Sequence, residues 1–233
     1  MKKVAVDIVN NKKQKNYTIF VGTKLLGNIS SLIDFSKYTK TFVVADKAVS
    51  ADTIKNLTAA LPIETSVLLL DSGEKQKTLQ SVQQIWEAMK SFGCDRKSLL
   101  INIGGGVIGD IGGFAASAFM RGIDFLQIPT TLLAQVDASI GGKVGINFSG
   151  IKNLIGTFQQ PIAVIADVAT LATLPKREFI SGFGEIIKHG AIADKKYFQL
   201  VTSKKPQDFS PEELIEIIEQ SCRIKATIVN QDE

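Results

Sequence analysis

The sequence is poor in the residues that bind transition metals or form disulfides. It has one histidine and two cysteines, Cys94 and Cys222, in 233 residues. The cysteines lack the close spacing of a metal site, so we expect a reduced, cytoplasmic protein. One histidine and two unrelated cysteines could complete a three-ligand zinc site only if carboxylates supplied most of the ligands.

Long runs of positive charge and long uninterrupted apolar segments are also missing. The net charge of +4 comes from scattered lysines, with no basic run longer than two. This does not indicate nucleic-acid binding, but it suits a small anionic substrate. The first 15 residues have no apolar export signal. Residues 98–120 carry one charge, Asp110, but glycines crowd their centre, so we expect no membrane helix.

Alternating segments predict the fold class. Residues 3–9 and 16–22 each alternate apolar and polar side chains, and the polar turn 10–16 between them predicts a hairpin. Further on, apolar strands alternate with amphipathic helices, which predicts an α/β fold with a doubly wound, mainly parallel sheet. The predicted buried strands are 41–46, 66–71, 98–103, 125–129 and 162–167, and the predicted helices are 48–61, 78–93 and 107–120.

The pattern becomes entirely helical after residue 174. We therefore predict an α/β domain over 1–174 and the first helices of an α-helical domain over 175–233. In the last of these helices Ser210 is a suitable N-cap and Pro211 suits the first turn. Glu212 and Glu213 would face the positive end of the helix dipole.

Residues 104–113, GGGVIGDIGG, contain glycines at 104, 106 and 109 in the G-x-G-x-x-G spacing. This spacing alone is a weak indication of dinucleotide binding, because here it follows about the fourth strand of the chain. Asp124 lies 20 residues beyond Gly104 but precedes a strand, whereas Asp46 and Asp71 end strands. Two interpretations remain equally open: a phosphate cradle at a helix N-terminus, or glycines that only permit close packing.

Other polar residues recur within apolar, glycine-rich segments. Glu185 and His189 are four residues apart, which puts them on one face of a helix. Each such residue alone could be an ordinary surface group, but their repetition is harder to explain by packing. The remaining members are Arg121, Asp137, Lys143, Asn147, Lys152, Asn153 and Lys188.

The long run 104–161 closely resembles 3-dehydroquinate synthases. The segments DSGEKQK, LATLPKREFISGFGEIIKHG and CRIKATIVNQDE extend the resemblance over essentially the whole chain. It implies a phosphorus–oxygen lyase of the shikimate pathway that uses NAD and a divalent metal, zinc or cobalt. It also implies a homodimer and conversion of 3-deoxy-D-arabino-heptulosonate 7-phosphate to 3-dehydroquinate and phosphate. The implied steps are oxidation, phosphate elimination, reduction and aldol closure.

The resemblance also assigns roles to individual residues. Glu185 matches the metal-ligating carboxylate, and Arg121 matches a residue that reaches the substrate phosphate of the neighbouring subunit. The substrate-binding and catalytic positions are Asp137, Lys143, Lys152, Asn153, Lys188 and Lys225. The cofactor positions are Asp46, Glu74, Lys77, Gly105, Gly106, Val107, Asp110, Thr130, Thr131, Lys143, Lys152, Thr170, Thr173 and Leu174.

The sequence departs from the family pattern at its C-terminal end. The family's histidine ligands come from farther along the chain, so we expect His189 to be a helix-surface or interface residue and not a ligand. We therefore expect this chain alone to be nearly inactive and its last apolar helix face, 213–229, to be exposed. Two alternatives remain: a related sugar-phosphate cyclase or polyol dehydrogenase, and a non-catalytic NAD-binding module.

Overall fold

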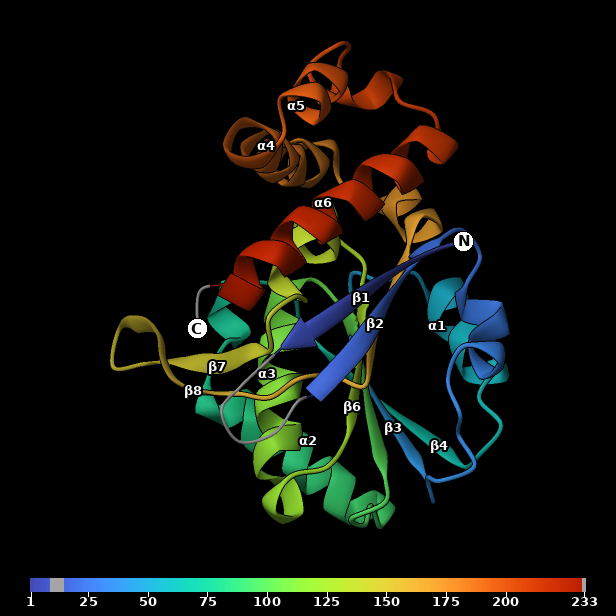
Figure 1. Ribbon diagram of the computed structural model, residues 1–233. Coiled ribbons are helices and arrows are strands. Elements are labelled where there is room, and N and C mark those ends of the chain that lie inside the picture. The colour runs from blue at the N-terminus through green and yellow to red at the C-terminus, as the bar shows by residue number, and fades with distance from the viewer. Residues whose placement is uncertain (9–14, 232–233) are drawn as a thin grey trace.

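A computed structural model describes residues 1–8 and 15–231 and contains a seven-stranded sheet (Figure 1). The strand order is β1-β2-β9-β6-β5-β3-β4, and only β1 runs antiparallel to its neighbour. This confirms the predicted fold class and the antiparallel pairing of the first two strands, although residues 9–14 of the predicted turn lie outside the described part. The strands are β1 Lys2–Ile8, β2 Lys15–Gly22, β3 Thr41–Asp46, β4 Thr65–Leu70, β5 Leu99–Gly104, β6 Phe125–Pro129 and β9 Ala163–Asp167.

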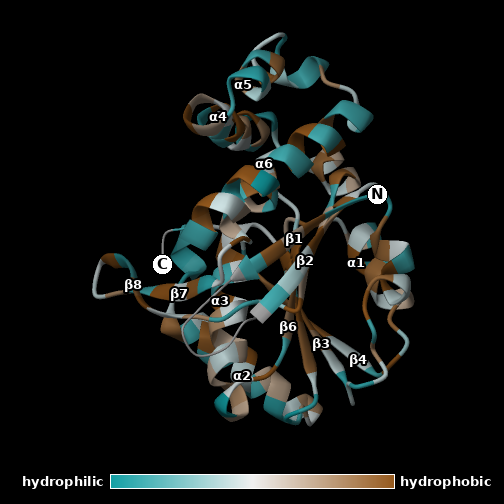
Figure 2. Cartoon of the chain, in the orientation of Figure 1, coloured by the Kyte–Doolittle hydropathy of each residue, from teal (hydrophilic) through white to brown (hydrophobic). Residues whose placement is uncertain are grey.

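Helices cover both faces of this sheet. Helices α2, α3 and α6 pack on the face formed by Val44, Leu100 and Val164, whereas α1 and the 3-10 turn Leu26–Ser31 pack on the face formed by Val43 and Ile101. Figure 2 shows that hydrophobic residues, coloured brown, are concentrated along the central strands. The helices are α1 Ala51–Ala59, α2 Leu79–Phe92, α3 Gly106–Ala118, α4 Lys176–Ala193, α5 Lys195–Val201 and α6 Pro211–Gln231.

Capping residues set the helix boundaries, and one of them, Ser210, was predicted from the sequence. Thr78 caps α2 through its hydroxyl, and Gly93 ends that helix in the left-handed conformation with φ 75°. The Ser210 hydroxyl accepts the amide hydrogen of Glu213 at 3.2 Å, and the Glu213 carboxylate accepts the Ser210 amide at 2.7 Å. This reciprocal pair is a capping box, which confirms the predicted start of α6.

Strand β4 corrects one sequence prediction. Residues 66–71 were expected to form a buried strand, but Val67 is 38% and Leu69 46% exposed. The strand lies at the edge of the sheet and pairs only with β3. An apolar run does not distinguish a central strand from an edge strand, because burial depends on strand order.

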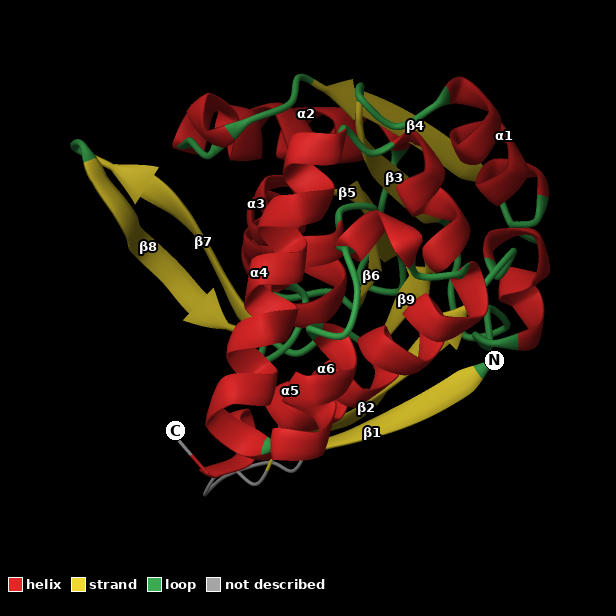
Figure 3. Cartoon of the chain, turned by 90° about the horizontal axis from the view of Figure 1, so that it is seen from above, coloured by secondary structure: helices red, strands yellow, loops and turns green. Residues whose placement is uncertain are grey.

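A separate two-stranded hairpin, β7 Lys143–Phe148 and β8 Ile151–Phe158, was not predicted from the sequence. It projects away from the main sheet (Figures 1 and 3). All of β8 is exposed, so its residues carry no burial pattern to reveal it. The hairpin matters for function because Lys143, Lys152 and Asn153 lie on it.

Helix α6 also differs from expectation. Its apolar face was expected to be exposed, but Leu214, Ile217, Ile218 and Cys222 are buried in a core shared with β1, β2 and α4. Strands β1 and β2, at the edge of the main sheet, provide the surface on which this helix packs (Figure 1). The proposed domain boundary near 175 remains a prediction, since these helices pack onto the same sheet as the preceding residues.

No helix within 1–8 and 15–231 is long and apolar enough to span a membrane.

The sheet changes direction between β3 and β5. From β3 the chain moves outward to β4 and then crosses back to β5 on the other side of β3. In doubly wound sheets, ligands bind at the carboxyl ends of the strands that flank this switch point. Here those ends are Asp46 and Gly104, and they lie side by side.

Helix α3 lies unusually close to the sheet because glycines form its inner face. A Cβ atom at Gly112 would overlap the Asn102 side chain, and one at Gly109 would lie 3.1 Å from Gln127 Oε1. Asn102 and Gln127 are buried partners on adjacent strands β5 and β6. Gly109 and Gly112 therefore set the distance between α3 and the sheet.

We predict that Gly112→Ala lowers the free energy of unfolding by about 1–3 kcal/mol, because the added methyl group must displace α3 or Asn102. Urea denaturation followed by circular dichroism measures this change. Gly184→Ala in α4 is the matched control, since a Cβ there meets nothing within 4 Å. That variant should be neutral or more stable, because alanine favours helices. Equal effects of the two substitutions would contradict the close-packing account.

Candidate functional site

A narrow crevice lies at the switch point of the sheet. Its lining includes Asp46 at the end of β3, Gly105 after β5 and Thr130 after β6. It has a volume of about 70 Å³. The crevice brings together seven residues that the sequence assigned to cofactor binding: Asp46, Gly105, Thr130, Thr131, Thr170, Thr173 and Leu174.

The structure distinguishes the two acids that end strands. Asp46 is 9% exposed, and its Oδ1 accepts the Ala48 amide hydrogen at 2.8 Å and the Ser72 hydroxyl. The Asp71 side chain is 65% exposed and forms an ion pair with Lys47 at 2.7 Å. Asp46 is therefore the acid held in the crevice, and its orientation is fixed by two hydrogen bonds.

The glycine turn serves both packing and access. A Cβ atom at Gly104 would lie 2.9 Å from the Asp46 Cβ, so that glycine is required by the close approach of β3 and β5. Gly105 precedes α3, and Gly106 and Val107 form its first turn, whose amide groups have no partner inside the helix. A Cβ at Gly105 would intrude to 3.2 Å from Thr131, into the crevice. The packing interpretation thus holds for Gly104, and these free amide groups could hold a phosphate, which stays a prediction.

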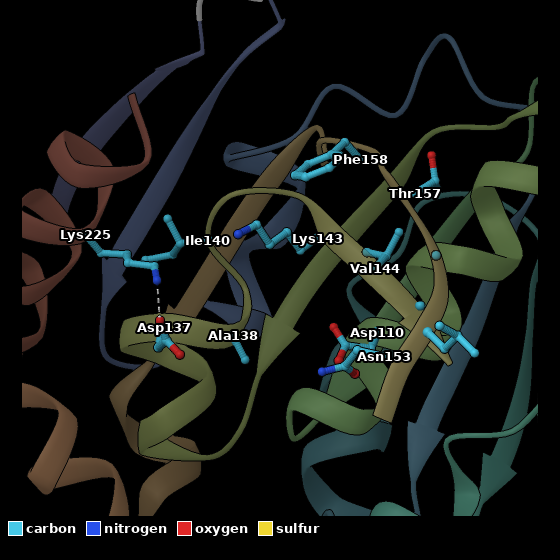
Figure 4. A pocket seen from close by; sticks show the side chains of 13 residues that line it. Asp110, Asp137, Ala138, Ile140, Lys143, Val144, Asn153, Thr157, Phe158 and Lys225 are labelled. Carbon is cyan, nitrogen blue, oxygen red and sulfur yellow. Dashed lines mark ion pairs between the residues drawn. The ribbon is translucent and has the colours of Figure 1, made fainter. Parts of the chain in front are cut away.

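A second, larger pocket lies between α3, the β7–β8 hairpin and α6 (Figure 4). Its volume is about 490 Å³. Lys225 Nζ lies 2.6 Å from Asp137 Oδ1 on one side, and Lys143 Nζ lies 5.9 Å from the centre of the Phe158 ring on the other. Five of the predicted site residues line this pocket: Asp110, Asp137, Lys143, Asn153 and Lys225.

A buried lysine connects α3 to the hairpin. The Lys77 ammonium group contacts both the Asp110 carboxylate and the Asn153 side-chain carbonyl, and its side chain is 8% exposed. Burial raises the pKa of Asp110 above its usual value, and the hydrogen bond and charge of Lys77 oppose that rise. The contact anchors the hairpin, since Asn153 lies on β8.

Glu74 and Lys77 lie beside the hairpin and do not line the Asp46 crevice. Glu74 Oε1 accepts a hydrogen bond from Asn147 Nδ2 at 2.9 Å and lies 3.7 Å from Lys152 Nζ. Asn147 Oδ1 in turn accepts the Asn153 amide hydrogen at 2.9 Å. The loop 72–77 thus supports the hairpin residues at the mouth of the larger pocket.

A cluster of potential metal ligands lies beside this pocket. One ligand atom from each of Asp137, Glu185 and His189 lies within 4.8 Å of the others. The Glu185 carboxylate contacts the exposed Lys188 ammonium and lies 3.2 Å from His189 Nε2. The predicted i,i+4 pairing of Glu185 and His189 is confirmed.

Of the two positions expected for His189, the helix surface is wrong and an interface stays a prediction. Its side chain is 1% exposed, because α6 packs over α4 and covers it. Its Nδ1 lies 2.6 Å from the hydroxyl oxygen of Ser221 on α6. Burial lowers the pKa of His189 more than the Glu185 charge raises it, which favours the neutral, ligand-competent imidazole.

Arg121 lies apart from the other predicted site residues. It lines a separate cleft with Lys37, Arg96, Lys97 and Asp124, and none of these lines the pocket in Figure 4. Both Met120 and Arg121 adopt positive φ values, 49° and 71°, so the turn that carries Arg121 is backbone-strained.

Ser221 and Gln135 hold the polar groups of the site in place but were not predicted from the sequence. Gln135 Nε2 donates to the carbonyls of Pro129 and Asp167 at 3.1 Å each, and so ties the π-helical turn Ala134–Ala138, which carries Asp137, to the ends of β6 and β9. Both residues are fully buried polar groups on otherwise apolar helical faces. A polar residue on an otherwise apolar helical face was the signal that could have identified them, because buried polar side chains normally have a specific partner.

We predict that Lys77→Met lowers the free energy of unfolding by about 3–5 kcal/mol, because it leaves the Asp110 carboxylate buried without a cation. The loss should increase between about pH 4 and pH 7. Without Lys77 the pKa of folded Asp110 rises further above its unfolded value, so the folded state binds the proton more tightly and loses stability as pH rises. Urea denaturation at both pH values measures the effect.

Lys152→Met is the matched control for this experiment, since the Lys152 side chain is 76% exposed and its ion pair spans 3.7 Å. This substitution should lower the free energy of unfolding by less than about 1 kcal/mol at either pH. A Lys77→Met loss that is small, or that does not depend on pH, would rule out the buried ion pair as the anchor of the hairpin.

Comparison with known solved structures supports the fold. A 2-epi-5-epi-valiolone synthase from Streptomyces hygroscopicus, solved with NAD⁺ and Zn²⁺, superposes with a TM-score of 0.82 at 29% identity, over 93% of this chain and 62% of its own. A 2-deoxy-scyllo-inosose synthase superposes with a TM-score of 0.89 at 24% identity, over 98% and 64%. An iron-containing alcohol dehydrogenase from Thermotoga maritima shares only the fold, at 16% identity and a TM-score of 0.70.

Sequence comparison identifies the family. Residues 67–181 match the profile "3-dehydroquinate synthase N-terminal", and residues 182–233 match "3-dehydroquinate synthase C-terminal". The 3-dehydroquinate synthase of Ruminiclostridium cellulolyticum is 40% identical over 228 residues, and that of Nitrosospira multiformis 38% identical over 238. These matches cover 96% and 100% of this chain but 64% and 65% of the relatives, and they do not favour the dehydrogenase alternative. The chain belongs to the 3-dehydroquinate synthase family.

Proposed function

We propose that this chain carries the NAD site and part of the active site of a 3-dehydroquinate synthase. The proposed reaction converts 3-deoxy-D-arabino-heptulosonate 7-phosphate to 3-dehydroquinate and phosphate. The observation that carries the proposal is the convergence of seven expected cofactor residues on the switch-point crevice, next to a pocket lined by five expected site residues. The family membership makes this combination specific, because the fold alone serves several reactions.

The crevice and the α3 N-terminus fit NAD. The first-turn amide groups at Gly106 and Val107 would bind the pyrophosphate, as helix N-termini do in other nucleotide sites. Asp46, held by Ala48 and Ser72, would accept hydrogen bonds from a ribose hydroxyl. The threonines Thr130, Thr131, Thr170 and Thr173 would line the remainder of the cofactor.

The larger pocket fits a small, doubly anionic sugar phosphate. Its volume of about 490 Å³ lies in the range of small-molecule sites. Lys143 and Lys225 supply positive charge, with Lys152 and Lys188 exposed nearby, while Asp137 and Asn153 can bind hydroxyl groups. Since Asp110 lies on α3 one turn beyond the cofactor cradle, the same helix positions both ligands.

Glu185 fits a divalent metal, zinc or cobalt, because its largely buried carboxylate lies in the cluster of possible ligand atoms and its partner Lys188 is exposed enough to move away. When bound, NAD accepts and returns a hydride and the metal polarises a substrate oxygen. The protein's own contribution is to orient the sugar ring between Asp137 and the lysines. Phosphate elimination would be assisted by those cations, which stabilise the departing anion.

A homodimer is part of the proposal. The cleft that Arg121 lines shares no residue with the larger pocket of the same chain. Arg121 would therefore contribute to substrate binding from a second copy of the chain. A cytoplasmic location is also proposed, supported by two cysteines that are both free and buried.

We predict that Asp46→Asn weakens NAD binding about tenfold, because a neutral amide accepts a hydroxyl hydrogen bond less strongly than a carboxylate. The amide oxygen can still accept the Ala48 amide hydrogen, so the fold should survive. Isothermal titration calorimetry with NAD measures the change. Asp71→Asn, at the end of the neighbouring strand but exposed, should bind NAD like the parent chain. If Asp71→Asn weakened NAD binding more than Asp46→Asn did, NAD would not bind at Asp46.

We predict that the heptulosonate phosphate binds the NAD-loaded chain and that Lys143→Met weakens this binding at least tenfold, because the pocket loses a cation. Calorimetry detects the binding without requiring turnover. Lys55→Met, on the exposed side of α1, is the charge-matched control. Binding that is unaffected by Lys143→Met, or displaced by glycerol, would overturn the proposed substrate.

A further inference from the structure

Gln135 is a completely buried polar residue whose side-chain amide is only half satisfied. Its Nε2 donates hydrogen bonds of 3.1 Å to the carbonyl oxygens of Pro129 and Asp167, but its Oε1 accepts none within residues 1–8 and 15–231. A buried acceptor without a partner costs free energy, which an apolar side chain of the same size would avoid. The amide is therefore explained by the groups that its Nε2 holds and not by full hydrogen bonding of its own.

The groups bonded to this Nε2 belong to the walls of the cofactor crevice. Pro129 ends β6 and directly precedes Thr130 and Thr131. Asp167 ends β9, three residues before Thr170. All three threonines line the crevice. Nε2 also lies 3.4 Å from the Thr170 hydroxyl oxygen, and that hydroxyl donates to the Asp167 carbonyl at 2.8 Å. One side chain therefore ties two walls of the crevice together.

The main chain of Gln135 leads to the larger pocket. The residue lies in the π-helical turn Ala134–Ala138, two residues before Asp137, which lines that pocket. The turn starts at the crevice, because Thr131 Oγ1 accepts the Ala134 amide hydrogen at 3.2 Å and the Thr131 carbonyl accepts the Gln135 amide hydrogen at 3.0 Å. One short segment thus begins at the cofactor crevice and ends at the substrate pocket.

The π-helical geometry makes the orientation of Asp137 depend on this anchor. The turn is closed by the i→i+5 hydrogen bond from the Ser139 amide to the Ala134 carbonyl oxygen, at 3.2 Å. Such single turns are rare and recur at functional sites. A π-helix has more residues per turn than an α-helix, so tightening to i→i+4 bonds would rotate Asp137 about the helix axis and away from its ion pair with Lys225. The Gln135 amide, bonded to two strand ends, opposes that rotation.

We propose that Gln135 is a positioning residue that couples NAD binding to the orientation of Asp137. NAD in the crevice restrains Thr130, Thr131 and Thr170. Through the Gln135 amide the same restraint fixes the π-helical turn, so the sugar phosphate meets an Asp137 that is already oriented. Thermodynamic linkage makes the effect reciprocal, and the sugar phosphate raises the affinity for NAD by the same factor. This proposal rests on the proposed function, since it concerns the same cofactor and substrate.

The first test follows amide hydrogen exchange of residues 132–140 by mass spectrometry and needs no substitution. Saturating NAD should slow the exchange of this segment at least about fivefold, because the restrained crevice walls suppress local opening of the turn. Helix α5 carries no residue of the crevice and is the internal reference. Unchanged exchange of 132–140, or equal slowing in α5, would overturn the proposal.

The second test measures the affinity for the heptulosonate phosphate by calorimetry, with and without saturating NAD, in a metal chelator that prevents turnover. The parent chain should bind the sugar phosphate about tenfold more tightly when NAD is present, a factor typical of coupled sites. Gln135→Met keeps a side chain of similar length but removes the Nε2 donors. It should reduce the factor to below about threefold, with the remainder carried by α3.

Cys222→Ala is the matched control. The completely buried Cys222 thiol donates to the main-chain carbonyl of Gln135 at 3.3 Å, so its removal disturbs packing around the same residue and leaves the side-chain amide intact. This variant should have a lower melting temperature and the coupling factor of the parent chain. Loss of coupling in both variants would make the role of Gln135 purely structural and overturn the proposal, as would an unchanged factor in Gln135→Met.

Two outcomes separate this proposal from the proposed function. If NAD and the heptulosonate phosphate both bind but do so independently, the coupling fails and the proposed function stands. If NAD does not bind, while Gln135→Met still speeds the exchange of residues 132–140 in the free chain, the anchoring of the turn stands and the proposed function fails.

Discussion

The close approach of helix α3 to the sheet is the constraint on which both candidate sites depend. Glycines at 109 and 112 allow the helix to rest directly on Gln127 and Asn102, and a Cβ at Gly113 would overlap Val144 of the hairpin. At this height the first turn of α3 opens into the switch-point crevice. Its second turn places Asp110 in the larger pocket. One helix therefore sets the position of cofactor and substrate relative to each other.

The polar groups of the larger pocket are held by contacts between segments that are distant in sequence. Lys77 joins the loop after β4 to α3 and to the hairpin, and Lys225 joins α6 to the π-helical turn. Lys77 neutralises a carboxylate, Asp110, that burial would otherwise destabilise, and Lys225 holds Asp137 by an ion pair. The charges that would bind an anionic substrate thus also fix the geometry of the site.

Helix α6 has a similar double role. Its apolar face completes the core over β1 and β2, while Ser221 and Lys225 reach His189 and Asp137 from the same helix. Any displacement of α6 would change the arrangement of potential metal ligands. The stability of the helical layer and the geometry of the metal cluster are therefore linked through one packing interface.

The sequence by itself determined the local structure and the family. Strand and helix periodicity, the caps at Thr78, Gly93 and Ser210, and the glycine turn are local properties, because each depends on neighbouring residues. The family resemblance also indicated which residues would come together. Seven of the cofactor positions line the crevice, and four substrate positions line the larger pocket together with Asp110.

Only the tertiary structure decided which of these residues act together. Strand order placed β4 at an exposed edge and Asp46 beside the glycine turn, and neither follows from a pattern within one segment. Strand β8 is exposed along its whole length, so no alternation of buried and exposed residues revealed the β7–β8 hairpin. His189 was expected at a helix surface or an interface because its helix offers no sign of the partner that covers it. Burial is a property of the contact between α4 and α6, which are joined only when the chain is folded.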